Sequence, residues 1–202
     1  AGLLLILFFP AASRAVSGQK HPSLCKTRYP SDSGVEWDCI RLGKGERVET
    51  RFGDLWKDVL RFNRVDRRHG YPGVPLKVPR RLEDMAGFTP MPAAYPGGDN
   101  EARQILVDLS EQFLGAYEHG KLVFSAPIAS GEGENEPPRG DFRITAYHSA
   151  HRSTEYFVEG TGVPYPMTWA LRFHIDREGV AYWIHGRDIP GYPASHGCVG
   201  LY

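Results

Sequence analysis

The second half of the chain consists of short apolar segments that are separated every few residues by glycine, proline or charged turns. These runs are rich in β-branched and aromatic side chains, and each is too short for a stable helix. We expect strands over residues 105–109, 113–117, 122–129, 142–145, 169–175 and 180–184. Many short strands with little helix predict a mostly β domain, built as a sandwich or a barrel-like sheet.

A helical pattern followed by one strand occupies part of the first half. Leu55, Val59 and Phe62 recur at helical spacing, and Asp54 is placed to cap the first turn. Residues 75–79 have the pattern of a short strand that ends at a proline. These elements predict a small α/β module ahead of the β domain.

The composition sets the expected boundaries. Residues 16–45 are rich in serine, glycine, proline and lysine and are predicted to be irregular. The α/β module is assigned to residues 46–80. Residues 81–103 are predicted to be a linker, because their prolines and glycines cannot continue a helix or a central strand. The β domain is assigned to residues 104–202.

The N-terminus has the pattern of an export signal. An apolar run over residues 2–9 is followed by the small-x-small sequence Ser13-Arg14-Ala15. The run is too short to span a bilayer, which takes about 20 apolar residues. We expect residues 1–15 to be the remnant of a signal peptide whose start is missing, and the protein to be exported to the periplasm or cell envelope. A buried helix or an uncleaved anchor is the alternative.

The three cysteines divide into a pair and a single residue. Cys25 and Cys39 lie close in sequence, and in an oxidising compartment they are expected to form a disulfide that closes a small loop. Cys198 then remains as a reactive thiol. The alternative is that all three cysteines are reduced and buried.

The net charge of the chain is zero, with 24 basic and 24 acidic residues. No overall field therefore favours nucleic acid or an anionic membrane, and we expect no nucleic-acid partner. A basic cluster either faces an anionic polymer or forms a solvated surface; it consists of Arg61, Arg64, Arg67, Arg68, Arg80 and Arg81.

Cys198 and His185 have the pattern of a thiol nucleophile and its base. His185 ends a predicted strand, and the loop that follows can fold the thiol back onto that strand. An imidazole beside a thiol favours the thiolate and later returns the proton to a leaving amine. Gly186 and Gly197 leave room for a substrate, and the Gly197 and Cys198 N–H groups are expected to form an oxyanion hole.

Other interpretations of these residues remain. His185, His196 and Cys198 could hold zinc, but a fourth ligand is not evident nearby. Structural histidines with a buried thiol are a second alternative. A papain-like protease is disfavoured, because such enzymes place the cysteine ahead of the histidine.

The sequence Ile184-His185-Gly186, followed after a spacer by Ser195-His196-Gly197-Cys198-Val199, resembles the signature of the L,D-transpeptidase catalytic domain. The resemblance covers residues 104–202. Supporting segments are 105–112, 120–123, 130–131, 138–142 and 166–170.

The resemblance implies a secreted cell-wall enzyme that acts on peptidoglycan stem peptides. Cys198 would attack the third stem residue, release the terminal D-alanine and pass the acyl group to an amine. His185 would be the general base and the Gly186 carbonyl would orient its ring. The loop and oxyanion site would be shaped by Ser195, His196 and Gly197. No metal and no organic cofactor is implied.

The first half also resembles a known module. Gly53-Asp54, Trp56, Phe62-Asn63 and the segment 72–79 are similar to a degenerate lysin motif (LysM), which implies contact with glycan strands. A plain helix-turn-strand segment packed on the main domain is the alternative.

The sequence departs from the transpeptidase pattern in three places. The spacer between His185 and Ser195 is short, Gly200 stands where a polar residue is usual, and family members continue beyond Tyr202, so we expect a C-terminal truncation. These departures leave two further possibilities for the activity. One is an L,D-carboxypeptidase, in which water resolves the thioester, and the other is a catalytically silent peptidoglycan-binding protein.

Overall fold

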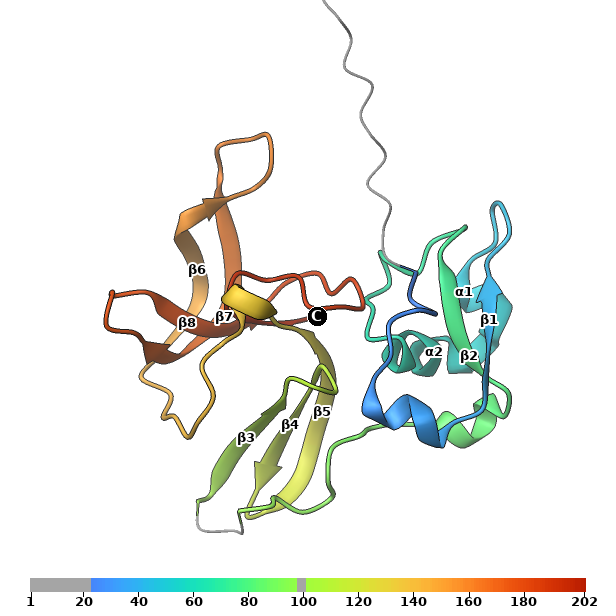
Figure 1. Ribbon diagram of the computed structural model, residues 1–202, viewed down its shortest axis with the longest axis horizontal. Helices are drawn as coiled ribbons and strands as arrows, with labels where there is room; N and C mark the ends of the chain where they lie inside the picture. The colour runs from blue at the N-terminus through green and yellow to red at the C-terminus, as the bar shows by residue number, and fades with distance from the viewer. Residues whose placement is uncertain (1–22, 98–100) are drawn as a thin grey trace, which may run out of the picture.

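The computed structural model describes residues 23–97 and 101–202, and the predicted signal sequence at residues 1–15 lies outside the described residues. Figure 1 shows two parts: an N-terminal module at the right, formed by residues 23–92, and a larger β domain at the left. Most of the regular structure is strand, so the prediction of a mostly β protein is confirmed.

The N-terminal module combines short helices with a two-stranded sheet. Its elements are η1 (Pro30–Gly34), β1 (Trp37–Arg41), α1 (Val48–Phe52), η2 (Gly53–Leu55), α2 (Trp56–Phe62), β2 (Pro75–Pro79) and η3 (Leu82–Met85). β1 and β2 pair antiparallel, and the helices lie between them in sequence. One apolar core, which includes Val48, Val59 and Leu76, joins the helices to the sheet.

Two predictions for this module were wrong. β1 lies in the segment predicted to be irregular; it forms because β2, distant in sequence, supplies its hydrogen-bonding partner. Asp54 does not cap a helix: it lies in η2, and α2 begins after Leu55 without a side-chain cap. Gly53, at φ 54°, directly follows α1 and is the first residue of η2, so it divides the helical pattern. The LysM likeness of residues 46–80 stays a prediction.

Cys25 and Cys39 form a disulfide, with the two sulfurs 2.07 Å apart. The bond attaches the beginning of the module to β1. Cys198 is the free cysteine of the described residues.

The β domain is one mixed sheet of seven strands in the order β3-β4-β5-β9-β8-β7-β6. Its elements are β3 (Arg103–Asp108), β4 (Phe113–Glu118), β5 (Lys121–Ala129), η4 (Gly133–Asn135), β6 (Ala146–Phe157), β7 (Pro164–Ile175), β8 (Ala181–Gly186) and β9 (Val199–Leu201). β9 lies between the two halves of the sheet, antiparallel to β5 and parallel to β8. The last strand thus joins β3–β5 to β6–β8.

The predicted strand at residues 142–145 is absent, and β6 begins only at Ala146. The segment contacts β7: the Thr145 N–H donates to the Arg172 carbonyl (2.8 Å), and the Phe142 ring packs on Phe173. Phe142 and Ile144 nevertheless remain exposed by 37% and 46%. Local apolar character was therefore not enough to form a regular strand.

Buried charges join the module to the β domain. Arg64 and Lys77 are fully buried, and Arg64 donates to Glu111 (Nη2–Oε2, 2.8 Å) in the turn between β3 and β4. Lys77 and Arg64 both contact Asp32, at 2.5 and 3.4 Å. Arg64 therefore belongs neither to a solvated face nor to a polymer-binding surface, the two interpretations considered for the basic cluster.

Among the described residues, no helix has the length and apolar character needed to cross a bilayer.

Candidate active site

The parallel pair β8–β9 places His185 and Cys198 on one face of the sheet. In this pair Ile184 lies opposite Val199, and both pack in the same apolar cluster. Side chains alternate along a strand, so Trp183, His185 and Cys198 face the other side. The contacts agree, because Cys198 packs with Trp183 in a second cluster. The sequence prediction that the loop returns the thiol to the histidine strand is consistent with this arrangement.

His185 is a buried imidazole whose orientation is fixed by its neighbour. The side chain is 5% exposed, and its Nδ1 lies 3.0 Å from the Gly186 carbonyl oxygen. A carbonyl oxygen only accepts hydrogen bonds, so Nδ1 carries the proton and Nε2 keeps a free lone pair. Burial lowers the pKa of His185 to about 4, with a further lowering by the charge of Arg187. The ring is therefore neutral at pH 7 and can accept a proton at Nε2.

Cys198 is a half-buried thiol. Burial raises its pKa above the ordinary value, while the backbone N–H of Trp183, which donates to the sulfur, and the charge of Arg187 lower it. Within the described residues no hydrogen bond joins the sulfur to the His185 ring. The resting site thus holds a neutral thiol and a neutral imidazole. Burial thus favours the neutral form of each group, whereas the sequence analysis expected the imidazole to favour the thiolate.

The Ser195-His196-Gly197 loop is held by the Ser195 hydroxyl and by the backbone carbonyl of Ser130. The Ser195 hydroxyl donates to the Cys198 carbonyl (2.5 Å) and accepts the Gly197 N–H (3.1 Å). The backbone N–H groups of Ala194 and Ser195 both donate to the Ser130 carbonyl. The Gly197 N–H is therefore already engaged, so of the two donors predicted for an oxyanion hole only that of Cys198 is left.

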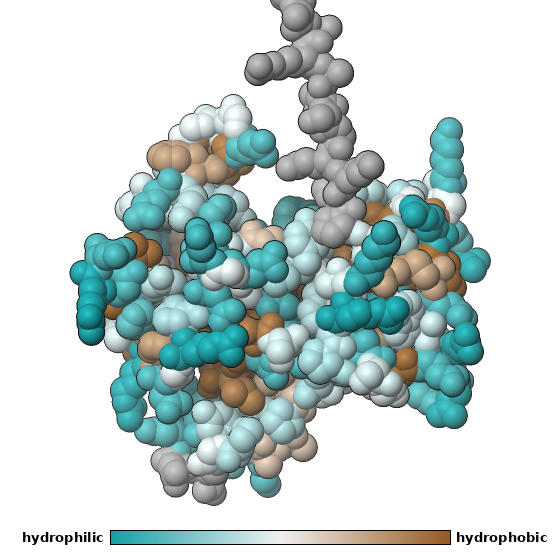
Figure 2. Space-filling view, viewed as in Figure 1, coloured by the Kyte–Doolittle hydropathy of each residue, from teal (hydrophilic) through white to brown (hydrophobic). Residues whose placement is uncertain are grey.

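His196 points away from this loop toward the β6–β7 hairpin. Its exposed ring stacks on Tyr156, with centroids 4.5 Å apart. The hairpin also carries exposed apolar side chains, and Figure 2 shows apolar surface near its tip at the upper left. They include Tyr147, Phe157, Val163 and Trp169. His196 is thus an aromatic contact between the loop and the hairpin, distinct from the buried His185.

Arg187 is a site residue that the sequence analysis missed. Its stem lies against Gly200, where an added Cβ would come within 2.1 Å of Arg187 Cδ. Its guanidinium donates to the carbonyl oxygens of Asp188 and Ala194, at 3.2 and 3.1 Å. The glycine at position 200 was the signal that could have identified it, since Arg187, directly after β8, fills the space that a side chain at position 200 would take.

Acid is expected to destabilise the fold through His185. The pKa of His185 falls from 6.5 to about 4 on folding, so between these values the unfolded chain binds a proton that the folded chain does not. This contribution is complete above pH 6.5 and is lost as the pH falls through about 4. It amounts to about 3 kcal/mol, since one pKa unit corresponds to about 1.4 kcal/mol.

Urea unfolding at about pH 7 and about pH 4.5 measures this loss. The variant His185→Asn keeps a donor near the Nδ1 position and is expected to lose most of the pH dependence. His119→Asn is the matched control, because His119 is exposed and asparagine tolerates its φ of 47°. An unchanged pH dependence in His185→Asn would contradict the assignment.

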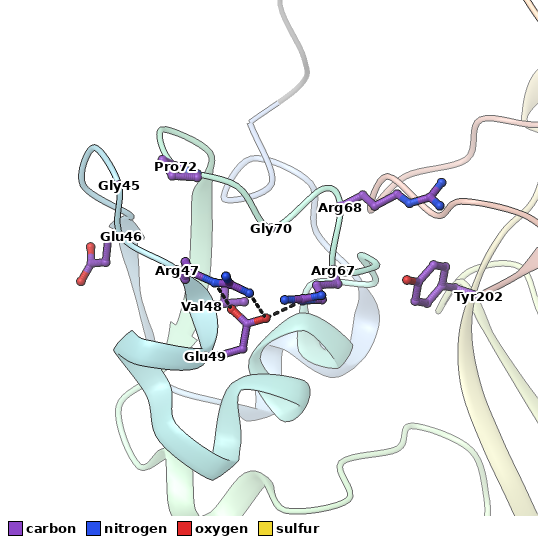
Figure 3. Close-up of a pocket in the computed structure, with 10 residues that line it drawn as sticks. All are labelled: Gly45, Glu46, Arg47, Val48, Glu49, Arg67, Arg68, Gly70, Pro72 and Tyr202. Atoms are coloured by element: carbon purple, nitrogen blue, oxygen red, sulfur yellow. Dashed lines mark hydrogen bonds and ion pairs between the residues drawn. The ribbon is translucent and has the colours of Figure 1, made fainter.

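A separate cavity of about 590 Å³ lies between the N-terminal module and Tyr202 of the β domain (Figure 3). It is lined by Gly45, Glu46, Arg47, Val48, Glu49, Arg67, Arg68, Gly70, Pro72 and Tyr202. Arg47 and Arg67 both contact Glu49 inside it. The cavity contains neither His185 nor Cys198. Within residues 23–97 and 101–202, no group of three or more histidine, cysteine or acidic residues is arranged to hold a metal ion.

The model of the YkuD family, the L,D-transpeptidase catalytic domain, matches residues 102–202. No curated protein matches the chain. Among solved structures, an L,D-transpeptidase from Xylanimonas cellulosilytica is 29% identical with a TM-score of 0.49, over 71% of this chain and 67% of that one.

Two more distant structures have the same description. An L,D-transpeptidase from Stackebrandtia nassauensis is 19% identical with a TM-score of 0.46, over 83% of this chain and 85% of that one. One from Mycobacterium smegmatis is 18% identical with a TM-score of 0.41, over 50% of this chain and 49% of that one. The family model, by contrast, spans half of the chain and includes His185 and Cys198, so this chain belongs to the L,D-transpeptidase catalytic domain family.

Proposed function

We propose that this protein is a peptidoglycan L,D-transpeptidase with Cys198 as nucleophile and His185 as general base. One observation carries the proposal: within the family domain, a buried histidine with its proton on Nδ1 shares a sheet face with the free cysteine. A neutral Nε2 is the acceptor that a neutral thiol requires.

The first half-reaction forms a thioester. Nε2 of His185 takes the Cys198 proton as the sulfur attacks the carbonyl carbon of the third stem residue. The tetrahedral intermediate collapses, the bond to the terminal D-alanine breaks, and the imidazolium returns its proton to the leaving amine. The Cys198 N–H is proposed to donate to the oxyanion, because Gly197 is engaged by Ser195.

The second half-reaction transfers the acyl group. An acceptor amine loses a proton to His185 and attacks the thioester, and the Cys198 sulfur leaves and recovers the proton. Cys198 and His185 are neutral before the donor binds and after the product leaves. The thiolate–imidazolium pair therefore exists only while substrate occupies the site. The Arg187 charge, which lowers the pKa of both residues, favours the thiolate but opposes the imidazolium.

The proposed partners follow from this chemistry. Stem peptides are the donor, and no metal or organic cofactor enters the steps above. The LysM-like residues 46–80 are proposed to contact glycan strands. The apolar N-terminal run and the Cys25–Cys39 disulfide support a location outside the cytoplasm.

The full chain, incubated with a disaccharide-tetrapeptide, is expected to release D-alanine and to gain the mass of the donor minus D-alanine on Cys198. Intact-mass spectrometry with peptide mapping measures the adduct, and the matching tripeptide donor is the control that can release no D-alanine. Cross-linked dimer as the product indicates transfer, whereas free tripeptide alone indicates the carboxypeptidase. Sacculus binding without D-alanine release would instead identify a binding protein and contradict the proposal.

A further inference from the structure

We propose that Asp66, in the N-terminal module, is a positioning residue for the active site: its carboxylate holds the loop that connects His185 to Cys198. The inference rests on the proposed function for its catalytic consequence. Its structural basis is the contact between residues 63–69 and residues 188–191, which belong to different parts of the fold (Figure 1).

The Asp66 carboxylate is buried and accepts four N–H groups. Its Oδ1 accepts the backbone N–H groups of Arg68 (2.7 Å) and His69 (3.0 Å), both within the module. Its Oδ2 accepts the Ile189 backbone N–H (2.7 Å) and lies 2.9 Å from the His69 Nδ1. The Asp66 N–H in turn donates to the Ile189 carbonyl (3.0 Å). The Asp66 side chain thus holds both the turn at residues 66–69 and the loop at Ile189.

The surrounding contacts extend this attachment along the loop. Val65 and Pro190 form an antiparallel β-bridge. The Tyr29 hydroxyl donates to the Gly191 carbonyl (2.7 Å). Arg68 pairs with Asp188 at 2.9 Å, and Figure 3 shows its side chain pointing toward this loop and away from Glu49.

Gly191 shows how closely the two parts approach. Its φ is +92°, and an added Cβ would lie 2.5 Å from Leu24 and 2.7 Å from Val65. Only glycine fits both the backbone conformation and the space. The loop therefore follows the module surface instead of extending into solvent.

This attachment controls the approach to the nucleophile. The loop leaves β8 after Gly186, contacts the module at residues 188–191, and reaches the Ser130 carbonyl at Ala194 and Ser195, shortly before Cys198. A short spacer held at two points has little freedom to move the thiol relative to the imidazole. Loss of the contact at residues 188–191 would let the thiol move relative to the imidazole. A small misplacement of the reacting groups lowers the rate by up to about 100-fold.

Asp66→Asn tests the proposal in the full chain. An amide replaces one carboxylate oxygen by an NH₂ group, so two of the four N–H donors face another donor. The expected results are faster hydrogen exchange at the Ile189 amide, at least about threefold faster alkylation of Cys198 by iodoacetamide, and a fall in kcat of about 10- to 100-fold with KM nearly unchanged.

Asp58→Asn is the matched control, because the Asp58 carboxylate accepts the Gly87 N–H (2.9 Å) wholly within the module. It should leave all three measurements unchanged. If Asp66→Asn does not fold, Tyr29→Phe removes the bond to Gly191 alone and is expected to shift the same measurements by a smaller factor. Wild-type exchange at Ile189 and wild-type alkylation in the folded variant would overturn the proposal.

The two proposals fail in different ways. A wild-type chain that releases no D-alanine would refute the proposed function. Hydrogen exchange at Ile189 and alkylation of Cys198 in Asp66→Asn would still test whether Asp66 positions the loop. Conversely, an active wild-type enzyme whose Asp66→Asn variant keeps full kcat would refute the positioning role alone.

Discussion

Cys198→Ala is expected to abolish the release of D-alanine from a tetrapeptide stem, by about 10⁴-fold or more. Without the sulfur no thioester can form, and His185 has no proton to accept. The fold should survive, because alanine fits the half-buried site beside Trp183 and removes only one packing atom. The measurement is D-alanine release by the full chain, together with the loss of the acyl adduct in the mass spectrum.

The double variant Cys25→Ala, Cys39→Ala is the matched control for this experiment. It removes two cysteines and the disulfide but leaves the site intact. Below its unfolding temperature it is expected to release D-alanine at close to the wild-type rate. Release by Cys198→Ala at a comparable rate would show that the nucleophile lies elsewhere.

Asp32→Ala is expected to be the most destabilising change to the fold, by about 3–5 kcal/mol. The Asp32 carboxylate is 2% exposed and is the acidic partner of both Lys77 and Arg64. Burial lowers the pKa of Lys77 to about 8, and the bond to Asp32 opposes that shift. Removing Asp32 therefore leaves an ammonium group in the core without its counter-ion.

Urea unfolding at pH 7 measures this loss, with Asp38→Ala as the matched control. Asp38 also pairs with an arginine, Arg80, but both side chains are more than half exposed. Loss of such a surface pair costs about 0–1 kcal/mol. If the two substitutions lowered the free energy of unfolding equally, the buried cluster of Asp32, Arg64 and Lys77 would not be stabilising the fold.

β3, β4, β5, β8 and the second half of β7 could be predicted because they follow local patterns. β6 and β9 were not predicted: β6 is a polar, mostly exposed strand, and β9 has only three residues. The strand at Pro75–Pro79 and the hairpin around residues 176–180 were placed correctly, since turn residues and alternation specify them. The strand predicted at residues 142–145 did not form, although Thr145 bonds to Arg172 of β7, because a strand needs regular pairing along its whole length. Arg64 was treated as a surface residue because Asp32 and Glu111, which neutralise it, are distant in sequence.

For the candidate site, local motifs were enough to single out His185 and Cys198, which the fold places on one face of the sheet. The pKa of each side chain depends on burial, which no local pattern reports. The contact of Asp66 with Ile189 could not be predicted either, because it joins segments that are 123 residues apart in sequence.

The packing of Arg187 on Gly200 makes the residue types at these two positions interdependent. The volume beside Gly200 is filled by the stem of Arg187, which directly follows β8, so a side chain added at position 200 of β9 would compete for it. A polar residue introduced at position 200, as the transpeptidase pattern would have it, therefore requires the Arg187 side chain to move away or to be replaced by a smaller one. The effect of a substitution at position 187 or 200 therefore depends on the residue at the other position, so the two positions should be varied together.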